Sequence, residues 1–227
     1  MRRSLFLSAF ACGVLTLAVP AVAQDRTGTW EISPFAGGYF GGRLYGNYSV
    51  PFSSGTVTNV RFLEEDDDLA YGGRLAYNVT RHFGFEVDWT SSRADLRSPD
   101  FFGSTPRNLK VGRLRQNVYE ANAIFNFGRR HVVGYVGIGA GSAVEKRDIA
   151  GINPAATGRF TANLSAGGKF FFVPRVGLRL DARVRTIDLR SDGDGGSCDH
   201  DHDGFCNNRH GPWSYNGEVT GGLVFAF

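Results

Sequence analysis

The sequence predicts an all-β protein in which eight antiparallel strands run up and down and close into a barrel. Three observations lead to this fold class. Eight segments alternate apolar and polar residues with a period of two, tight turns and long loops alternate between those segments, and Gly (31 of 227 residues) and aromatic residues (13%) are abundant. The fold is expected to occupy one domain, residues 24–227.

The overall composition excludes two classes of protein. Lys and Arg (25) nearly balance Asp and Glu (22), so the chain lacks the clustered basic excess of a nucleic-acid-binding protein. The hydrophobic fraction of 42% is too high for a disordered chain. We therefore expect a folded protein with no nucleic-acid partner.

The first 23 residues have the pattern of a cleaved export signal peptide. Two arginines follow the initial Met, an apolar run covers residues 5–19, and Ala21-Val22-Ala23 provides the small-x-small cleavage site before Gln24. Because this site follows the apolar run at once, we favour cleavage over a membrane anchor and over lipid attachment at Cys12. Removal of the two arginines lowers the formal net charge from +3 to +1.

The first four strands follow from the patterns over residues 29–40, 69–79, 83–90 and 117–127. The first, TWEISPFAGGYF, is the least regular, and Pro34 requires a local irregularity because proline cannot donate to a strand ladder. The second sets Leu, Tyr and Val against Arg74. The third sets Phe, Val and Trp against Glu86 and Asp88, and the fourth sets Tyr, Ala and Phe against Glu120.

The last four strands alternate more cleanly, over residues 132–144, 160–172, 176–185 and 213–227. The first of these sets Val, Ile and Ala against Tyr135 and three glycines, and the next sets Phe, Ala and Leu against small polar residues and Lys169. Along 176–185, Val, Leu and Ala share one face, whereas Arg179, Asp181, Arg183 and Arg185 share the other. The C-terminal segment separates aromatic and aliphatic residues from Ser, Asn, Glu and Thr.

The connections between the strands alternate in length. Tight turns are expected at residues 78–82, 128–130 and 173–175, and long loops near 41–68, 95–111, 145–158 and 190–212. Short turns at one end and long loops at the other are typical of transmembrane barrels, whose tilted strands need about 9–11 residues to cross the bilayer. We therefore expect short periplasmic turns and long extracellular loops.

The apolar face of the strands is predicted to point outward, toward lipid. A water-soluble barrel, such as a lipocalin, would bury this face instead. Three features favour the membrane: aromatic residues gather at the strand ends, the polar face is rich in Gly, Ser, Thr and Asn, and the chain stops on an aromatic residue at a strand end. An Arg facing lipid at the midplane costs about 2–4 kcal/mol, so the arginines of 176–185 are expected to point inward.

Two segments carry a family resemblance, WEISPFAGGYF near the expected mature start and the terminal GGLVFAF. Together with the exported eight-strand pattern, they resemble the outer-membrane β-barrel family, which includes the small OmpA/OmpX-type barrels. The resemblance implies a location in the outer membrane of a Gram-negative-type cell envelope. It also implies that Leu223, Phe225 and Phe227 form the C-terminal signal read by the barrel-assembly machinery. It implies no particular activity, because this fold carries many functions.

Nine charged residues of the polar face are predicted to point into the lumen. They are Arg74, Glu86, Asp88, Glu120, Lys169, Arg179, Asp181, Arg183 and Glu218. Eight strands enclose an interior that side chains can fill, and opposite charges in such an interior pair with one another. We expect a salt-bridged plug that fixes the shape of the barrel. The alternatives are a path for small solutes or ions, and catalysis inside the lumen.

The sequence predicts no catalytic residues. A lipid-modifying enzyme needs a nucleophile with a base and an orienting group. His82 and His131 fall in tight turns with no obvious Ser partner, and the other histidines share one loop. We therefore expect a non-enzymatic protein with a structural or surface-interaction role through its extracellular loops. The alternatives are a narrow porin or small-molecule transporter, and a lipid-modifying enzyme.

The loop over residues 190–212 carries a candidate metal site. Asp199, Asp201 and Asp203 alternate and Gly204 follows them, as in the first half of a calcium-binding loop. The bidentate Glu of such loops is missing, because His210 stands at its position. Ca²⁺ is therefore the one candidate cofactor, in a weak site. The alternatives are a Zn²⁺-type site that uses the histidines of the loop and a solvated polar loop without metal.

The same loop carries a candidate disulfide. Cys198 and Cys206 bracket the alternating acidic residues, and they are the two cysteines left after removal of the signal peptide. In the oxidising compartment that an export signal implies, two such neighbours are expected to pair.

Three arginines are predicted to face the lipid headgroups. Arg93, Arg113 and Arg115 lie near the outer ends of neighbouring strands, with the parity of the lipid-facing residues. They would donate charge-assisted hydrogen bonds to lipid phosphates, or snorkel as ordinary interfacial residues. The expected partners are outer-membrane lipid and lipopolysaccharide, the barrel-assembly machinery and an extracellular ligand that the sequence does not identify.

Overall fold

The computed structural model describes residues 26–51, 57–97, 110–129, 131–149, 156–188 and 213–227. These residues form ten β-strands: β1 (Thr29–Phe40), β2 (Arg43–Pro51), β3 (Val57–Glu65), β4 (Asp68–Asn78), β5 (Phe83–Arg97), β6 (Lys110–Arg129), β7 (Val132–Ile149), β8 (Thr157–Val173), β9 (Val176–Asp188) and β10 (Trp213–Ala226). In these ranges we find no helix with the length and apolar character needed to cross a membrane.

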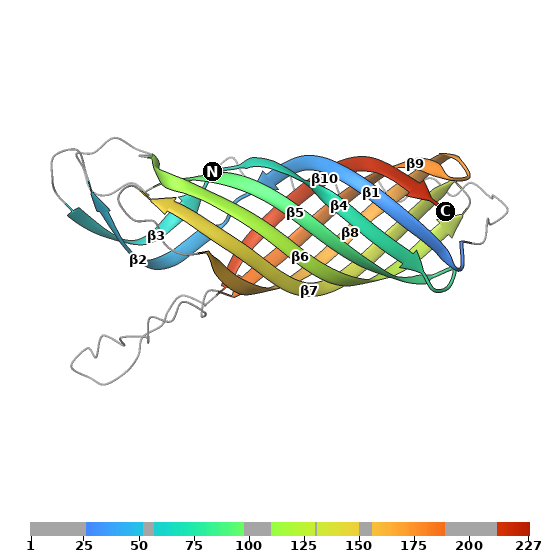
Figure 1. Cartoon of the computed structure of the whole chain (residues 1–227), viewed down its shortest axis with the longest axis horizontal. Helices are drawn as coiled ribbons and strands as arrows, with labels where there is room; N and C mark the ends of the chain where they lie inside the picture. The colour runs from blue at the N-terminus through green and yellow to red at the C-terminus, as the bar shows by residue number, and fades with distance from the viewer. Residues whose placement is uncertain (1–25, 52–56, 98–109, 130, 150–155, 189–212) are drawn as a thin grey trace, which may run out of the picture.

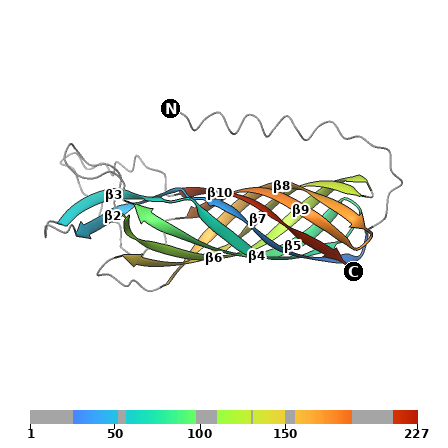
Figure 2. The same ribbon diagram turned by 90° about the horizontal axis from the view of Figure 1, so that it is seen from above.

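Eight of the strands close into a barrel. Around the ring, each strand pairs antiparallel with the next in the order β1, β4, β5, β6, β7, β8, β9 and β10, and β10 pairs again with β1. Figures 1 and 2 show the wall from two sides, with β2 and β3 projecting beyond one rim. The predicted eight-stranded antiparallel barrel is therefore confirmed.

The long loop expected near residues 41–68 contains a β-hairpin that was not predicted. β2 continues outward beyond β1, pairs antiparallel with β3, and β3 leads back into β4. β3 also pairs with the outer end of β5, through Glu64 and Glu65. The segment carries strand-favouring Val, Thr and Phe residues, but the alternation is imperfect and the register shifts between Tyr45 and Tyr48. Strict alternation alone therefore could not reveal this hairpin.

Directly opposed residues can be followed around the ring from Trp30 until the path meets β1 again at Phe40, ten residues further along the strand. The path runs through Tyr77, Phe85, Ala123, Ile138, Leu164, Val184 and Gly217. This offset is the shear of the barrel, and with eight strands it corresponds to a strand tilt of roughly 40°. The interior of such a barrel is narrow enough for side chains to fill it.

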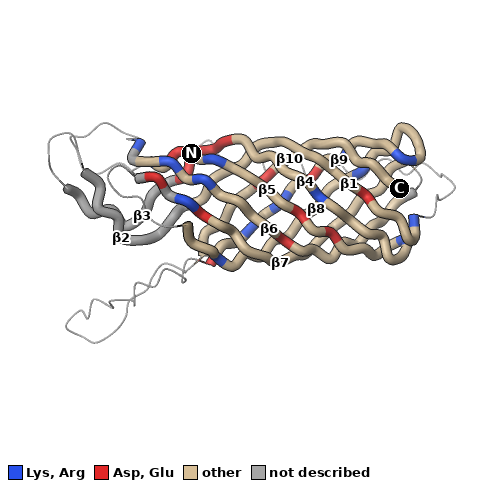
Figure 3. The backbone as a smooth tube through the Cα atoms, in the orientation of Figure 1, with Lys and Arg blue, Asp and Glu red and all other residues tan. Residues whose placement is uncertain are grey.

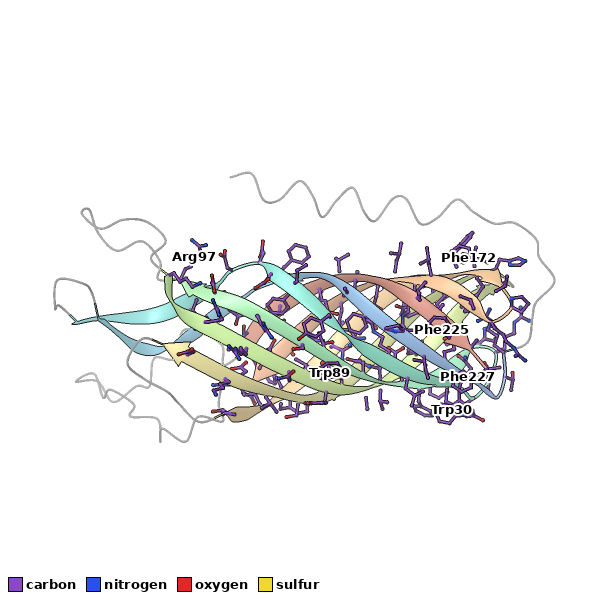
Figure 4. All side chains as sticks on the ribbon, turned by 45° about the horizontal axis from the view of Figure 1, so that its top comes forward. Trp30, Trp89, Arg97, Phe172, Phe225 and Phe227 are labelled. Atoms are coloured by element: carbon purple, nitrogen blue, oxygen red, sulfur yellow. The ribbon has the colours of Figure 1, made fainter. Side chains whose placement is uncertain are left out.

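The barrel is polar inside and apolar outside. Large aliphatic residues are exposed on the wall, among them Leu180 (67%), Leu164 (63%) and Ile138 (62%), whereas most buried side chains are charged or polar. A water-soluble barrel would show the opposite arrangement, so the apolar face points toward lipid. Figure 4 shows the aromatic residues Trp30 and Phe172 near the end of the barrel that carries the tight turns.

Pro34 interrupts one ladder without shifting its register. Trp30 and Phe227 exchange both backbone hydrogen bonds, so the even-numbered residues of β1 bond toward β10. The pairing with β10 skips Ser33 and Pro34 and resumes at Phe35 in the same register. The pairing of Pro34 with Gly73 of β4 is intact. The expected irregularity is therefore a gap in the ladder to β10.

Candidate functional site

A network of buried ion pairs fills the middle of the lumen. Its centre is Arg183 on β9, which is 2% exposed. Nη1 of Arg183 lies 2.7 Å from Asp88 Oδ2 and 2.9 Å from Glu120 Oε2, and Nη2 lies 3.6 Å from Glu86 Oε1. One guanidinium group therefore connects β9 to β5 and β6 across the interior.

Two further arginines extend the network to β4 and β7. Nη2 of Arg74, on β4, lies 3.3 Å from Asp181 Oδ1. Arg179 forms an ion pair with Glu86, and its Nη2 lies 3.4 Å from Asp181 Oδ2. The hydroxyl group of Tyr135, on β7, donates to Asp181 and accepts from Arg179 Nε at 2.8 Å. These groups share partners, so none of them can move independently.

Arg185 completes the central network. Its Nε and Nη2 each donate to one carboxylate oxygen of Glu120, at 3.0 Å, and its Nη1 donates to Glu218 Oε2 at 3.3 Å. Such bidentate pairing fixes the orientation of both groups. Together with Arg74, Arg179 and Arg183, this residue forms one continuous network with Glu86, Asp88, Glu120, Asp181 and Glu218.

Separate ion pairs lie toward the two ends of the lumen. Near the tight turns, Lys169 Nζ lies 2.5 Å from Glu31 Oε2, and Arg26 Nη1 lies 3.5 Å from Glu31 Oε1. Near the opposite end, Arg159 Nε lies 3.0 Å from Glu145 Oε2. All five side chains are at most 12% exposed. Paired charge therefore extends along the described length of the lumen.

Inward-facing glycines on β7 allow this strand to lie close against β6. A Cβ on Gly141 would lie 1.9 Å from the carbonyl oxygen of Tyr119, and a Cβ on Gly139 would lie 1.8 Å from Asn122 Oδ1. Neither approach is sterically allowed. Glycine at these two positions is therefore required for the close approach of β7 to β6.

All nine residues of the predicted lumen set lie in the lumen, each at most 5% exposed. Eight of them belong to the central network, and Lys169 pairs with Glu31 instead. The predicted set omits Glu31, Glu145, Arg159 and Arg185, which are also buried and paired. The alternation of inward and outward residues could have identified all four. Arg185 shares the face of Arg183, and the other three continue the inward alternation of their strands.

The three predicted headgroup residues face outward, but they occupy two different rows. Arg93 lies directly opposite Arg115, and Arg115 lies directly opposite Lys146, which the prediction omits. Arg113 lies one row nearer the rim, and its Nε is 3.5 Å from Asp95 Oδ1. Figure 3 shows charged positions gathered at this end of β5 and β6. The predicted set therefore divides into two groups. Arg93 and Arg115 belong to a row of like charges with Lys146, whereas Arg113 is paired with a carboxylate.

The histidines of the tight turns make backbone contacts. Nδ1 of His82 lies 3.1 Å from the carbonyl oxygen of Asn126, and Nδ1 of His131 lies 3.1 Å from that of Phe171. Each ring therefore connects a turn to the end of a neighbouring strand. This structural role accounts for the position of both histidines.

The predicted assembly residues lie on the outer face of β10. Leu223, Phe225 and Phe227 are 43%, 39% and 62% exposed, so all three side chains face lipid, and Figure 4 shows Phe225 and Phe227 toward the tight-turn end. Their recognition by the assembly machinery stays a prediction.

The predictions for the 190–212 loop and for the signal peptide lie outside the described residues. Asp199, Asp201, Asp203, Cys198 and Cys206 all belong to this undescribed part, so the Ca²⁺ site and the disulfide stay predictions. Within the part of the chain that the structure describes, no group of three or more His, Cys, Asp and Glu residues is placed to hold a metal ion.

Comparisons with known proteins agree with this architecture. Residues 9–205 match the family model of the outer membrane protein beta-barrel domain. The structure is similar to that of the outer membrane protein OprG from Pseudomonas aeruginosa, with 10% sequence identity, a TM-score of 0.60 and coverage of 91% of this chain and 99% of that chain. It is also similar to Neisserial surface protein A, with 15% identity, a TM-score of 0.52 and coverage of 88% and 98%. No curated protein matches the sequence.

Proposed function

The chain belongs to the outer membrane protein β-barrel domain family and lies in the Gram-negative outer membrane, and we propose that it is a non-enzymatic barrel with a sealed lumen that acts at the cell surface. In this proposal the barrel is a rigid support. The extracellular loops, the β2–β3 hairpin and the outer wall make the contacts with partners.

The central ion-pair network is the observation that carries this proposal. Arg183 reaches carboxylates on β5 and β6 from β9, and Arg74 reaches Asp181 from β4. Breaking a buried pair leaves an uncompensated charge, at a cost of about 3–5 kcal/mol. A solute that passes through the lumen would break several such pairs at once. The network therefore supports a closed barrel rather than a transport path.

Single-channel recording in planar bilayers tests the proposal. We expect the wild-type barrel to give no discrete conductance steps. The double variant Arg183→Ser/Arg185→Ser removes two large groups from the lumen and serves as the positive control, which should show steps. Insertion is checked in both samples by heat-dependent gel mobility. Stable conductance steps from inserted wild-type protein would contradict the sealed lumen.

A narrow pore is the second candidate function, and one observation favours it. Several buried polar atoms have no hydrogen-bond partner among the described residues, and they include Thr90 Oγ1, Asn163 Oδ1 and Asn216 Nδ2. Buried polar groups of this kind are commonly satisfied by water. Water that reaches these atoms would hydrate part of the lumen. The same recording distinguishes the two functions, because partial hydration without a path gives no steps.

A further inference from the structure

The outer wall of β5, β6 and β7 carries a row of three positive side chains. Arg93, Arg115 and Lys146 lie directly opposite one another on adjacent strands, and all three are exposed. Among the described residues, no ion pair joins any of the three to a carboxylate. Like charges directly opposite each other destabilise a sheet. An anion bound between them would remove this repulsion.

The next row toward the rim is different in character. Arg113 lies opposite Asp95 on one side and Asp148 on the other. Lys110 Nζ also lies 2.5 Å from Asp95 Oδ2. The protein's own carboxylates therefore neutralise this row. Within the described part of the chain, the row of Arg93, Arg115 and Lys146 has no such carboxylates, so it can bind an external anion.

A groove of about 930 Å³ lies on the same wall, on the membrane side of the cationic row. It is formed by two consecutive outward-facing rows that cross β1, β4, β5, β6 and β7. Gly73, Ala121 and Ala140 are small enough to leave its floor open, and a Cβ on Gly73 would have no heavy atom within 4 Å. Trp89 and Tyr119, directly opposite each other, stand on its headgroup side.

The two features lie at the depths that a lipid molecule requires. Trp and Tyr side chains mark the boundary between headgroups and hydrocarbon. Arg93 follows Trp89 by four residues, which is about 13 Å along the strand and roughly 10 Å along the membrane normal at a tilt near 40°. Asn117, in the row between, accepts a hydrogen bond from Trp89 Nε1 at 3.4 Å and holds that ring in place. Arg93 therefore lies at phosphate depth, and the groove opens into the hydrocarbon. Arg115 and Lys146 lie progressively further outward, because the row climbs with the tilt of the strands.

We infer that this wall binds one molecule of a lipid A-type glycolipid, with its phosphates on Arg93, Arg115 and Lys146 and an acyl chain in the groove. The row spans two strand spacings, or roughly 10 Å, which suits a headgroup with two separated phosphates better than a single phosphodiester. Lys and Arg also donate charge-assisted hydrogen bonds to phosphate oxygens. The apolar floor of the groove can contact an acyl chain, which a free phosphate ion lacks.

Native mass spectrometry of the full mature protein in detergent tests this inference, with diphosphorylated lipid A, monophosphorylated lipid A, phosphatidylglycerol and inorganic phosphate as separate probes. We expect one diphosphorylated lipid A to stay bound under activation that removes the other three. Each near-surface cation contributes about a fivefold change in affinity, so Arg93→Gln/Arg115→Gln/Lys146→Gln should weaken lipid A binding about 100-fold. Gly73→Leu should fill the groove and weaken lipid A binding about tenfold.

Two matched variants control for general effects. Arg113→Gln removes one cation from the neighbouring paired row, and Gly168→Leu adds the same side chain to another part of the wall where a Cβ also meets nothing within 4 Å. Both should change lipid A binding less than threefold. Equal binding by the triple variant and the wild type would overturn the inference. Equal retention of phosphatidylglycerol would overturn the assignment to a diphosphorylated glycolipid.

The lipid site depends on the outer wall, whereas the sealed lumen of the proposed function depends on the inward-facing ion pairs. Conductance steps would refute the sealed lumen and leave lipid A retention unchanged. Loss of selective lipid A retention would refute this site and leave the conductance result unchanged.

Discussion

Trp30 on the first strand and Phe227, the residue that follows the last strand, exchange two backbone hydrogen bonds of 3.0 Å each. This pair is the final step of the seam between β1 and β10. The side chain of Phe227 takes no part in these bonds and is 62% exposed to lipid. The backbone role and the side-chain role of this residue can therefore be separated by substitution.

Phe227→Ala should lower the amount of folded barrel in the outer membrane several-fold, because it removes the ring that resembles an assembly signal. It keeps both backbone bonds, so the free energy of unfolding of protein refolded in vitro should change by about 0.5 kcal/mol or less. Heat-dependent gel mobility of isolated membranes measures the folded fraction. Phe172→Ala, an aromatic residue exposed near the same end, is the control. An equal loss in the control would refute a specific signal at Phe227.

Arg183→Met should destabilise the barrel by about 3–5 kcal/mol, because it leaves Asp88 and Glu120 as buried carboxylates without their main partner. Urea unfolding in lipid vesicles measures the change. Arg175→Met, in the exposed turn between β8 and β9, makes the same chemical change at the surface and should cost less than about 0.5 kcal/mol. Adding Asp88→Asn to Arg183→Met should recover part of the loss. Similar stabilities for the two single variants would contradict an energetically important network.

Gly141→Ala should destabilise the barrel by about 1–3 kcal/mol, because the new Cβ would lie 1.9 Å from the carbonyl oxygen of Tyr119. Gly168→Ala is the matched control, since a Cβ there has no heavy atom within 4 Å, and it should be neutral or stabilising by up to about 1 kcal/mol. The same unfolding measurement compares the two. If both variants behaved alike, the requirement for glycine where β7 approaches β6 would be refuted.

Pro34→Thr should stabilise the barrel by about 1 kcal/mol, because it supplies the backbone N–H that is missing from the ladder to β10. Hydrogen exchange should show added protection at this amide. Ala36→Thr places the same side chain on the same face of β1, where pairing with Gly221 is already complete. It should bring no added protection. An unprotected amide at position 34 would show that the two strands stay apart there for another reason.

The mature chain should contain no reactive thiol, because Cys198 and Cys206 are the two cysteines that remain after signal removal and should be paired. A bridge over so short a segment contributes about 2–3 kcal/mol in the chain-entropy model. A free-thiol assay on the denatured, unreduced protein checks this. Two reactive groups per chain would refute the disulfide, and the reduced protein gives the reference value.

Much of the fold follows from the alternation of odd-numbered and even-numbered residues between the two faces of each strand. Each inward charge on 176–185 has outward neighbours that are apolar, so the orientation of Arg179, Arg183 and Arg185 follows once one face is assigned to lipid. The turn after β6 also follows, because Gly128, next to the end of that strand, has a φ of +113°, a conformation that favours glycine. Local patterns of this kind need no knowledge of distant segments.

Two other features depend on information that parity does not contain. The partners of a lumen charge depend on the shear, and nothing along β4 indicates that Arg74 meets Asp181 of β9. The division of the outward arginines likewise depends on register, because only the alignment of β5, β6 and β7 puts Arg93 beside Arg115 and Lys146 while Arg113 meets Asp95. The wall groove is lined by residues of five strands and has no signature within any one of them.

The span of the lumen pairs along the sequence has a consequence for how the barrel enters the membrane. Arg74 and Asp181 are separated by 107 positions, and Glu31 and Lys169 by 138. A sheet made of the early strands alone would expose Arg74, Glu86 and Asp88 before their counterparts on β9 arrive. Hydrocarbon rejects such uncompensated charge, so an incomplete cylinder has no stable resting place in the bilayer. We therefore expect insertion to be cooperative and to require the last strands, which carry the partners of these charges.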